Sequence, residues 1–429
     1  MKNVVLLTID ALRADHLSCY GYDRTTTPFL DSFAEQSILF ENTYSTSSHT
    51  REAMASLLSG TYPDEAIEDD YSISAETVAS HLADTHLCGG FHSNPYLSRA
   101  FGYDRDFEAF DDDLRLGQNR ILGLIQRALD KFVFNRGSYH ARASEINERS
   151  LNWLDSIQDE EPYFLWNHYM DVHGPYNPPT DYNTWSDPIS DSDAQQLYDA
   201  LSGGEAVSED DVGRALNLYD GEILYTDALI EEFITELDRR DHLEDTLVLI
   251  TADHGDLFGE YDSFAHPRYV YPELTRVPLL VRTPETQTGR VQGACSTVDI
   301  LPTILDWIGQ SNEQLAGRSL FDDVESDRVV YSTARGEDDN QHCRRIAANQ
   351  RGHSHLLEYD TQRETIQHER RIVSNPEQSS ANNCDIDWGM LRDNARSFGQ
   401  VHAESKSAPG SGAEVEEEIE RRLDALGYK

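Results

Sequence analysis

The sequence predicts an α/β fold: a mainly parallel central sheet between layers of helices, followed by a small C-terminal α+β subdomain. Residues 3–9, 163–169 and 246–251 are short, continuous apolar runs, the pattern of buried parallel strands. Helical patterns lie between these runs, and such alternation is typical of a sheet with helices on its faces. A chain of 429 residues is long enough for one large core with an appended unit.

The helices are predicted from the spacing of apolar residues and from their start signals. Thr27-Pro28 opens one helix, and a run of Ser and Thr precedes another that reaches Gly60. Further helices are expected at residues 77–82, 144–157, 212–239 and 303–308. Residues 180–212 are polar and acidic, which indicates a surface excursion over the strand ends.

The alternating pattern weakens near residue 320. We therefore predict a catalytic domain over residues 1–320 and a C-terminal subdomain over residues 321–429. Residues 374–412 are polar and poor in apolar residues, which predicts a mobile loop, and residues 414–426 predict a closing helix. Strands of a small sheet are expected at residues 329–331 and 354–359.

The chain is strongly acidic, with 78 Asp and Glu against 35 Lys and Arg and a formal net charge of −43. Such a surface, poor in Lys but retaining Arg, indicates a halophilic protein of a high-salt cytosol, because salt screens the repulsion between carboxylates. It argues against nucleic acid or an anionic membrane surface as a steady partner. Abundant aromatic and apolar residues exclude a disordered acidic chain.

The expected location is cytoplasmic. The first apolar run passes directly into Asp10, without the basic region and cleavage site of a signal peptide. No stretch of about 18 apolar residues occurs, so no integral membrane segment is expected. The five cysteines are odd in number and lack CxxC spacing, which predicts reduced thiols.

Residues 47–60 are the stretch in which we expect the chemistry. Ala53, Met54, Leu57 and Leu58 recur at helical spacing behind a run of hydroxyl residues, and a hydroxyl at a helix start can satisfy a free backbone N–H. The same position binds anions, because the free N–H groups and the helix dipole point at the ligand. A hydroxyl there is a candidate nucleophile toward a sulfate or phosphate ester, with a plain helix cap as the alternative.

Two aspartates, Asp10 and Asp253, each follow an apolar strand, and His254 follows the second. Open α/β sheets collect their ligands at the carboxyl ends of the strands. Two carboxylates and an imidazole suit one divalent metal ion, Mn²⁺, Ca²⁺, Zn²⁺ or Mg²⁺, with positions left open for substrate. Such an ion lowers the pKa of a coordinated hydroxyl and neutralises ester oxygens as charge develops.

Three further residues are candidates for catalysis. A leaving alcohol needs a proton, which His173 or His266 could supply, because both lie downstream of predicted strand ends. Arg51 could pair with an ester oxygen. Each residue also has an ordinary interpretation, as a turn or surface histidine or as a surface arginine in the first turn of a helix.

Several segments, in order along the chain, resemble motifs of the sulfatase branch of the alkaline phosphatase superfamily. These are residues 7–17, 55–63, 173–176, 251–255, 276–282 and 299–305, with residues 423–428 similar to the family's closing helix. The resemblance implies an alkaline-phosphatase-like α/β/α sandwich and a metal-dependent hydrolase. Together with the acidic composition, it resembles a haloarchaeal-type sulfatase-like protein.

The sequence departs from the sulfatase pattern in three places. Ala11 stands where sulfatases usually show a second aspartate. The cysteine of the Cys-x-Pro-x-Arg motif is missing, so no formylglycine is expected. His254 stands where many sulfatases have Asn, which resembles the phosphodiesterase, phosphonate monoester hydrolase and phospho-headgroup transferase relatives.

The nucleophile depends on the register of the motif. Aligning residues 55–60 with the family's Ala-Ser-Leu-Leu-Thr-Gly puts Thr50 on the cysteine position without a gap. Aligning Arg51 with the motif's arginine selects Ser47 instead, but requires three extra residues at a helix start. We therefore predict that Thr50 is both nucleophile and metal ligand, forming a sulfo- or phospho-enzyme directly.

The predicted function is hydrolysis of a sulfate ester or of a phosphate or phosphonate ester, on a small molecule or a glycan. The catalytic set is Thr50, His173, His266 and Arg51, and the metal set is Asp10, Thr50, Asp253 and His254. One alternative is a transferase that moves a phospho- or sulfo-group onto a glycan or lipid headgroup. The other is a catalytically silent, sulfatase-like binding protein.

Overall fold

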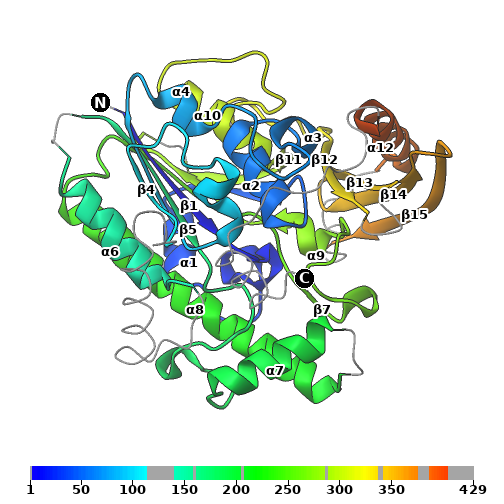
Figure 1. The fold of residues 1–429 in the computed structure, drawn as a ribbon, viewed down its shortest axis with the longest axis horizontal. Helices are drawn as coiled ribbons and strands as arrows, with labels where there is room; N and C mark the ends of the chain where they lie inside the picture. Colours follow the sequence, from blue (N-terminus) through cyan, green and yellow to red (C-terminus); the bar gives the residue numbers. More distant parts are fainter. Residues whose placement is uncertain are drawn as a thin grey trace.

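The computed structural model describes residues 2–113, 140–157, 161–203, 207–285, 288–336, 342–374 and 386–403. A large central sheet carries helices on both faces, and a small second sheet beside it carries one more helix (Figure 1). This is the predicted α/β/α sandwich with an appended C-terminal unit.

The central sheet has the strand order β11-β2-β10-β6-β1-β5-β3-β4, and β9 pairs with β2. The run from β6 to β4 is parallel throughout, whereas β10 is antiparallel to both of its neighbours. The strands are β1 (Asn3–Ile9), β2 (Ile38–Tyr44), β3 (Leu87–Phe91), β4 (Ala109–Asp111), β5 (Tyr163–Tyr169), β6 (Thr246–Ala252), β9 (Arg276–Val277), β10 (Leu279–Arg282) and β11 (Gly289–Ser296).

Strand β1 lies at the centre of the sheet and contributes to the cores on both faces. Val5 and Leu7 belong to one core and Val4 and Leu6 to the other, and all four are fully buried. Each such side chain contributes roughly 1.5–3 kcal/mol on burial, so a strand covered on both faces must be apolar throughout. This burial explains the continuous apolar run in the sequence.

Helices cover the two faces of the central sheet (Figure 1). One face carries α1 (Pro28–Ala34), α6 (Ala143–Leu154) and the long α8 (Glu209–Arg239), and the other carries α2 (Thr50–Ser59), α4 (Val78–Leu82) and α10 (Ile300–Trp307). Shorter elements are α3 (Pro63–Ala66), α9 (Pro272–Thr275) and the hairpin of β7 (Leu257–Phe258) and β8 (Phe264–Ala265). The acidic excursion contains α7 (Asp191–Ser202), which packs beside α8.

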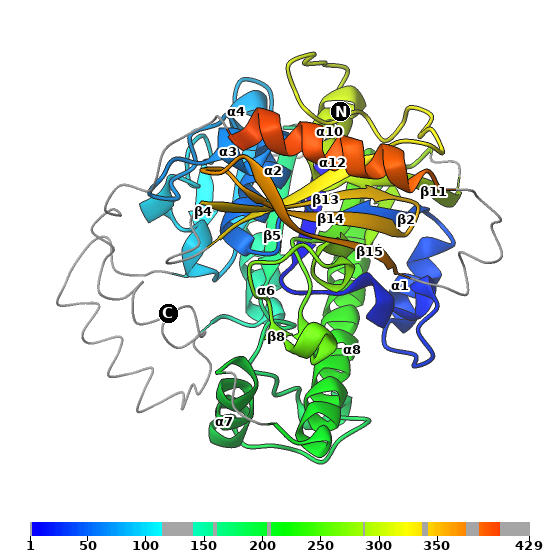
Figure 2. The ribbon, with the colours of Figure 1, turned by 90° about the vertical axis from the view of Figure 1, so that its right-hand side faces the viewer.

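The C-terminal unit is an antiparallel sheet covered by one helix (Figure 2). Its strands, in sheet order, are β12 (Val330–Arg335), β13 (Cys343–Gln350), β14 (His353–Asp360) and β15 (Thr365–Val373), and the helix is α12 (Trp388–Ala403).

Helix α12 corrects the prediction of a polar mobile loop over residues 374–412, which is wrong for residues 388–403. Leu391, Ala395 and Phe398 recur at helical spacing and pack against Ile346 and Leu357 of the small sheet. A few apolar residues on one face are enough when a sheet is available to cover them. The closing helix predicted over residues 414–426 lies outside the described residues.

No helix in the described part of the chain has the length and hydrophobicity that crossing a membrane requires. The four cysteines within the described ranges are buried and unpaired, as the prediction of reduced thiols expects.

Candidate active site

The site is built where three parallel strands end. In the register of the sheet, Ile9 at the end of β1 lies opposite Tyr169 of β5 and Ala252 of β6. The next residues after β1 and β6 are Asp10 and Asp253, so both carboxylates emerge side by side at the carboxyl edge. Both side chains are completely buried.

The two oxygens of Asp10 have different environments. Oδ2 accepts hydrogen bonds from Asn94 Nδ2 at 2.7 Å and from His168 Nε2 at 3.1 Å. Oδ1 has no hydrogen-bond partner among the described residues. Burial alone would raise the pKa of Asp10, but the hydrogen bond from His168 and the charges of His173 and His254 hold it far below its ordinary value.

Asp253 shows the same asymmetry. Its Oδ1 accepts the backbone N–H of His254 at 2.8 Å and that of Ala11 at 3.2 Å. Its Oδ2 is buried and has no hydrogen-bond partner among the residues that the structure describes. Burial and the negative charge of Asp10 raise the pKa of Asp253. Burying two carboxylates with oxygens that lack hydrogen-bond partners costs folding free energy unless a cation neutralises their charge.

The imidazole of His254 is held with a defined ring nitrogen toward the carboxylates. Its Nδ1 lies 3.0 Å from the carbonyl oxygen of Gly255, and because a carbonyl only accepts, Nδ1 carries the proton. Nε2 is then a lone-pair donor, 3.5 Å from Asp10 Oδ1 and 3.7 Å from Asp253 Oδ2. Gly255 is required for this turn, since a Cβ would lie 2.2 Å from the carbonyl oxygen of Glu273.

Thr50 is the first residue of α2, and its side chain is buried in the same place. The Thr50 Oγ1 lies 3.4 Å from Asp10 Oδ2 and 3.2 Å from His254 Nε2. The apolar face of α2, including Met54 and Leu58, is buried in one of the two main cores and fixes the position of its N-terminus. Thus the structure brings together the four predicted metal-site residues.

Ser47, the alternative nucleophile, is also buried, but it lies in the loop before α2. No described hydrogen bond joins its Oγ to Asp10, Asp253 or His254. The gap-free register of the sequence motif therefore agrees with the geometry better than the register that selects Ser47.

A divalent cation fits this group of side chains. One ligand atom from each of Asp10, Asp253 and His254 lies within 4.8 Å of the others. The two bare carboxylate oxygens and the lone pair of His254 Nε2 are the hard and borderline donors that such cations bind. A cation would also remove the repulsion that raises the pKa of Asp253.

Of the two predicted proton donors, His266 lies against His254, and His173 lies against His266. The ring of His266 is centred 4.8 Å from that of His254 and 5.0 Å from that of His173. His173 Nδ1 donates to the carbonyl of Gly174 at 2.7 Å, which leaves Nε2 as its other ring nitrogen. Both predicted histidines are therefore buried beside the candidate cation site.

His266 is oriented by a carboxylate that sequence reasoning did not select. Asp256 Oδ1 accepts from His266 Nδ1 at 2.7 Å, and Asp256 Oδ2 accepts from the Tyr176 hydroxyl at 2.6 Å. Burial opposes ionisation of Asp256, but attraction and hydrogen bonding to His266 lower its pKa. His254, Asp256 and His266 also lie within metal-binding distance of one another, but both oxygens of Asp256 are already hydrogen bonded.

Arg51 occupies a different environment. Its guanidinium lies 3.9 Å from the ring centre of Tyr71 and 4.4 Å from that of Tyr96. No contact among the described residues joins it to the cation group, so its pairing with an ester oxygen stays a prediction.

The sequence analysis also left out His168 and Asn94, both of which bind Asp10. His168 lies inside β5, where a histidine is indistinguishable from a core residue until the neighbouring strand is known. The Asn94-Pro95 turn after β3 was the available signal for Asn94, because β3 ends at the same edge of the sheet.

Comparison with known proteins shows the family of this chain. The Sulfatase family model matches residues 2–310, which include every site residue described above. The chain belongs to the sulfatase family. The resemblance found in the sequence is thereby confirmed at the level of the family, and with it the prediction of a hydrolase of sulfuric or phosphoric esters.

Curated relatives of this sulfatase-family chain align over most of its length. It is 26% identical over 407 residues to an arylsulfatase of Clostridium perfringens (strain 13 / Type A), covering 79% of this chain and 83% of the relative. It is 27% identical to a choline-sulfatase of Rhizobium meliloti (strain 1021), covering 73% of this chain and 69% of the relative.

Solved structures share the fold of this sulfatase-family chain. A phosphonate monoester hydrolase from Silicibacter pomeroyi superposes with a TM-score of 0.68 at 18% identity, covering 95% of this chain and 96% of that one. A structure in complex with D-glucosamine-2-N,6-O-disulfate gives a TM-score of 0.70 at 15% identity, covering 94% and 100%. The predicted fold class is confirmed.

Proposed function

We propose that this chain is a divalent-metal-dependent hydrolase of a sulfate, phosphate or phosphonate ester, with the hydroxyl of Thr50 as the nucleophile. The decisive support is the position of Thr50 Oγ1, which is buried at the N-terminus of α2 within 3.4 Å of Asp10 Oδ2 and 3.2 Å of His254 Nε2. A hydroxyl in that place can be ionised by its neighbours and can meet an anionic ester at the helix N-terminus.

Asp10, Asp253, His254 and Thr50 would hold the cation. When bound, it supplies positive charge that favours the ionised hydroxyl and the charge developing on the ester oxygens. Asn94 and His168 both donate hydrogen bonds to Asp10 Oδ2. These bonds would hold the carboxylate so that Oδ1 stays directed at the cation site.

In the resting enzyme Thr50 Oγ1 would be ionised, its proton having passed to bulk water. In the first step this oxygen forms a bond to the sulfur or phosphorus of the ester while the bond from that atom to the alcohol oxygen breaks. The departing oxygen takes a proton from His266 or His173, and the alcohol leaves. The ion pair with Asp256 stabilises the protonated form of His266 before this transfer. The product of the step is an ester of Thr50.

In the second step, water attacks the sulfur or phosphorus and the bond to Thr50 Oγ1 breaks. The histidine that gave up its proton accepts one from the attacking water, so the enzyme returns to its first state. Sulfate, phosphate or phosphonate is released.

Further properties belong to the same proposal. No cysteine stands in a Cys-x-Pro-x-Arg motif, so the enzyme acts without formylglycine. Its net charge of −43 supports the proposal that it works in the cytoplasm of a salt-rich, haloarchaeal-type cell. Residues 1–320 form the catalytic domain, and residues 321–429 form the C-terminal subdomain. Relatives named arylsulfatase and choline-sulfatase support a sulfate ester on a small molecule, and a glycan ester remains within the proposal.

The test compares an aryl sulfate with an aryl phosphodiester as substrates of metal-loaded protein in concentrated KCl. Wild type, Thr50→Ala, Thr50→Ser and Ser47→Ala are assayed side by side, with and without a chelator. We expect Thr50→Ala to lower kcat by at least ~10³-fold, Thr50→Ser to keep measurable turnover, and Ser47→Ala to match wild type.

The preferred ester separates a sulfatase from a phosphodiesterase. Loss of turnover in Ser47→Ala alone would move the nucleophile to Ser47. Turnover that survives complete removal of metal would contradict the role of the cation. Metal binding without hydrolysis of either ester would favour a transferase.

A further inference from the structure

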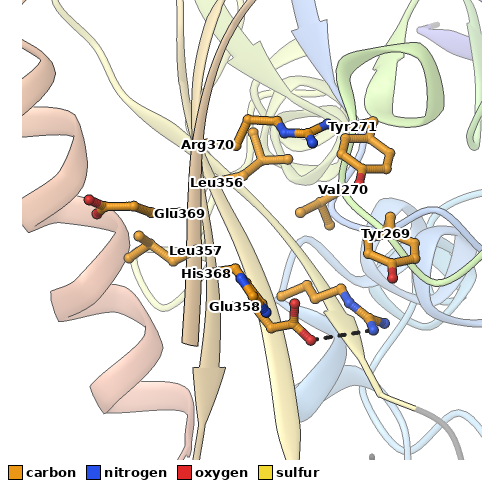
Figure 3. A pocket seen from close by; sticks show the side chains of 10 residues that line it. Tyr269, Val270, Tyr271, Leu356, Leu357, Glu358, His368, Glu369 and Arg370 are labelled. Atoms are coloured by element: carbon orange, nitrogen blue, oxygen red, sulfur yellow. Dashed lines mark ion pairs between the residues drawn. The ribbon is translucent and has the colours of Figure 1, made fainter. Parts of the chain in front are cut away.

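A cavity lies between the catalytic domain and the small C-terminal sheet (Figure 3). Its volume is about 470 Å³, within the range of about 300–1,000 Å³ that small-molecule sites occupy. One wall is the segment from Tyr269 to Tyr271, and the other is formed by β13, β14 and β15. None of the residues assigned to catalysis above lines it.

The first wall is aromatic. The rings of Tyr261, Tyr271 and Tyr269 are nearly parallel, with centroids 3.8 Å apart for the first pair and 5.1 Å apart for the second. The hydroxyls of Tyr269 and Tyr271 make no hydrogen bond within the described residues. With the apolar Val270, they form a wall that offers both apolar contact and free hydroxyls, and Leu356 of β14 adds an apolar side chain to the opposite wall.

The cavity carries an excess positive charge in a chain of net charge −43. Arg345 is neutralised by Glu358, at 3.6 Å. Glu369 is directed away, toward α12, where it pairs with Arg392 at 2.8 Å (Figure 3). Arg370 has no carboxylate partner in the described part of the chain, and its guanidinium lies 5.2 Å from the ring centre of Tyr261. An anion is the natural partner of this guanidinium.

The cavity is close to the catalytic group along a fixed segment. Tyr269 is three residues beyond His266, a separation that an extended chain spans in at most about 11 Å. Ser48, two residues before Thr50, donates to the carbonyl of Pro267 at 3.3 Å. Arg345 of the small sheet donates to the carbonyl of Arg268 at 2.6 Å. One segment thus connects the start of α2 with the cavity.

We propose that this cavity binds the alcohol part of the substrate, and that this part is an anionic sugar. The tyrosine wall would contact the ring and its hydroxyls, and Arg370 would pair with a carboxylate or sulfate on the ring. The place of the sugar in the reaction rests on the proposed function, but its binding does not.

The test measures binding of glucuronate and of glucose to the full chain by ligand-observed NMR, at a KCl concentration that keeps it folded. Arg370→Gln is compared with Arg371→Gln, a matched control: the two arginines are neighbours on β15, but Arg371 lies over Trp388 of α12, on the opposite side of the sheet. A third variant, Tyr269→Ala, removes part of the aromatic wall.

We expect glucuronate to bind more tightly than glucose, and Arg370→Gln to weaken glucuronate binding by about tenfold or more. Tyr269→Ala should weaken both sugars, and Arg371→Gln neither. Equal binding of the two sugars, no binding of either, or equal effects of the two arginine variants would overturn the proposal.

Two further results separate this proposal from the hydrolase. Thr50→Ala should bind glucuronate as wild type does. For a glucuronate that carries the ester cleaved by the enzyme, Arg370→Gln should have a higher KM than wild type. An unchanged KM would refute the place of the sugar in the reaction. Binding through Arg370 in a chain that hydrolyses no ester would overturn the hydrolase and leave the sugar site standing.

Discussion

The carboxylate of Asp256 orients the imidazole of His266 and lies next to it in a buried pair. Asp256 accepts from His266 Nδ1 at 2.7 Å and is itself fixed by the hydroxyl of Tyr176. All three side chains are buried, so the imidazolium is stabilised by an ionised neighbour that bulk water does not screen. We therefore predict that Asp256 positions His266 for its proposed role as proton donor.

Asp256→Asn tests this role. The amide can still accept the hydrogen bond but no longer stabilises the charge of His266, so kcat for an alkyl ester should fall by up to about 100-fold. An activated nitrophenyl ester, whose leaving group needs no proton, should lose much less. The control is Asp210→Asn at an exposed position in the first turn of α8. Equal losses on both esters would indicate a merely structural role.

The sequence predicted the four residues that follow strand ends or begin α2, because those positions can be read from local patterns. His168, Asn94 and Asp256 could not be selected in the same way. Their roles depend on contacts across the sheet or between loops, such as that of His168 with Asp10, 158 positions away. A histidine in an apolar strand and an aspartate two residues beyond a candidate metal ligand have no local signature.

Among the elements, long apolar strands and strongly periodic helices were predicted well. Strands β1, β5 and β6 lie within a residue of their predicted ends. No prediction covered β2 or β11. The first contains Glu41 and Asn42, and the second is exposed over its first half, so neither has the continuous apolar pattern of a central strand. Strand β11 lies at an edge of the sheet, where less apolar surface is buried, whereas β2 lies between β11 and β10 and its apolar pattern is interrupted by the two polar residues.

Helix α12 was missed because its apolar face is narrow, and that face should be essential to the C-terminal unit. Leu391 is completely buried against the small sheet. Leu391→Ala should lower the free energy of unfolding by about 2–5 kcal/mol, measured with denaturant. Asp393→Ala, at an exposed position of the same helix, is the control. Equal stability of the two variants would show that α12 does not hold the sheet.

A buried charge cluster links α6 with α8. Arg142, at the start of α6, binds Asp171 and Glu222, each at 2.9 Å, so one guanidinium serves two carboxylates. Burial raises the pKa of Glu222 to about 7, against the opposing charge of Arg142 and with the added repulsion of Asp171. In the unfolded chain the same carboxyl ionises near 4.5.

The cluster should make stability depend on pH. Between about 4.5 and 7, the folded chain keeps a proton on Glu222 that the unfolded chain has lost, so stability falls as pH rises, by roughly 3 kcal/mol in total. Glu222→Gln has no carboxyl group to titrate at this position, so its free energy of unfolding should change less with pH. Denaturant unfolding at a series of pH values measures this, and parallel profiles would contradict it.

For the whole molecule, the dominant physical property is its charge of −43. Self-repulsion of this size destabilises a compact state unless salt screens it, and the Debye length falls from about 10 Å at 0.1 M to about 3 Å at 1 M. We expect the melting temperature to rise steadily with KCl from about 0.1 M upward. Full stability at about 0.1 M would refute the halophilic interpretation.

The three strands that end at the site come from distant parts of the chain: β1 ends at Ile9, β5 starts at Tyr163 and β6 starts at Thr246. Their pairing closes very long loops, a topology of high contact order that forms slowly. The site cannot exist before all three are paired, so a cation that binds there selects the folded chain. Each tenfold increase in its concentration above Kd then adds about 1.4 kcal/mol of stability. A cation bound at the proposed site would thereby also stabilise the pairing of the three central strands.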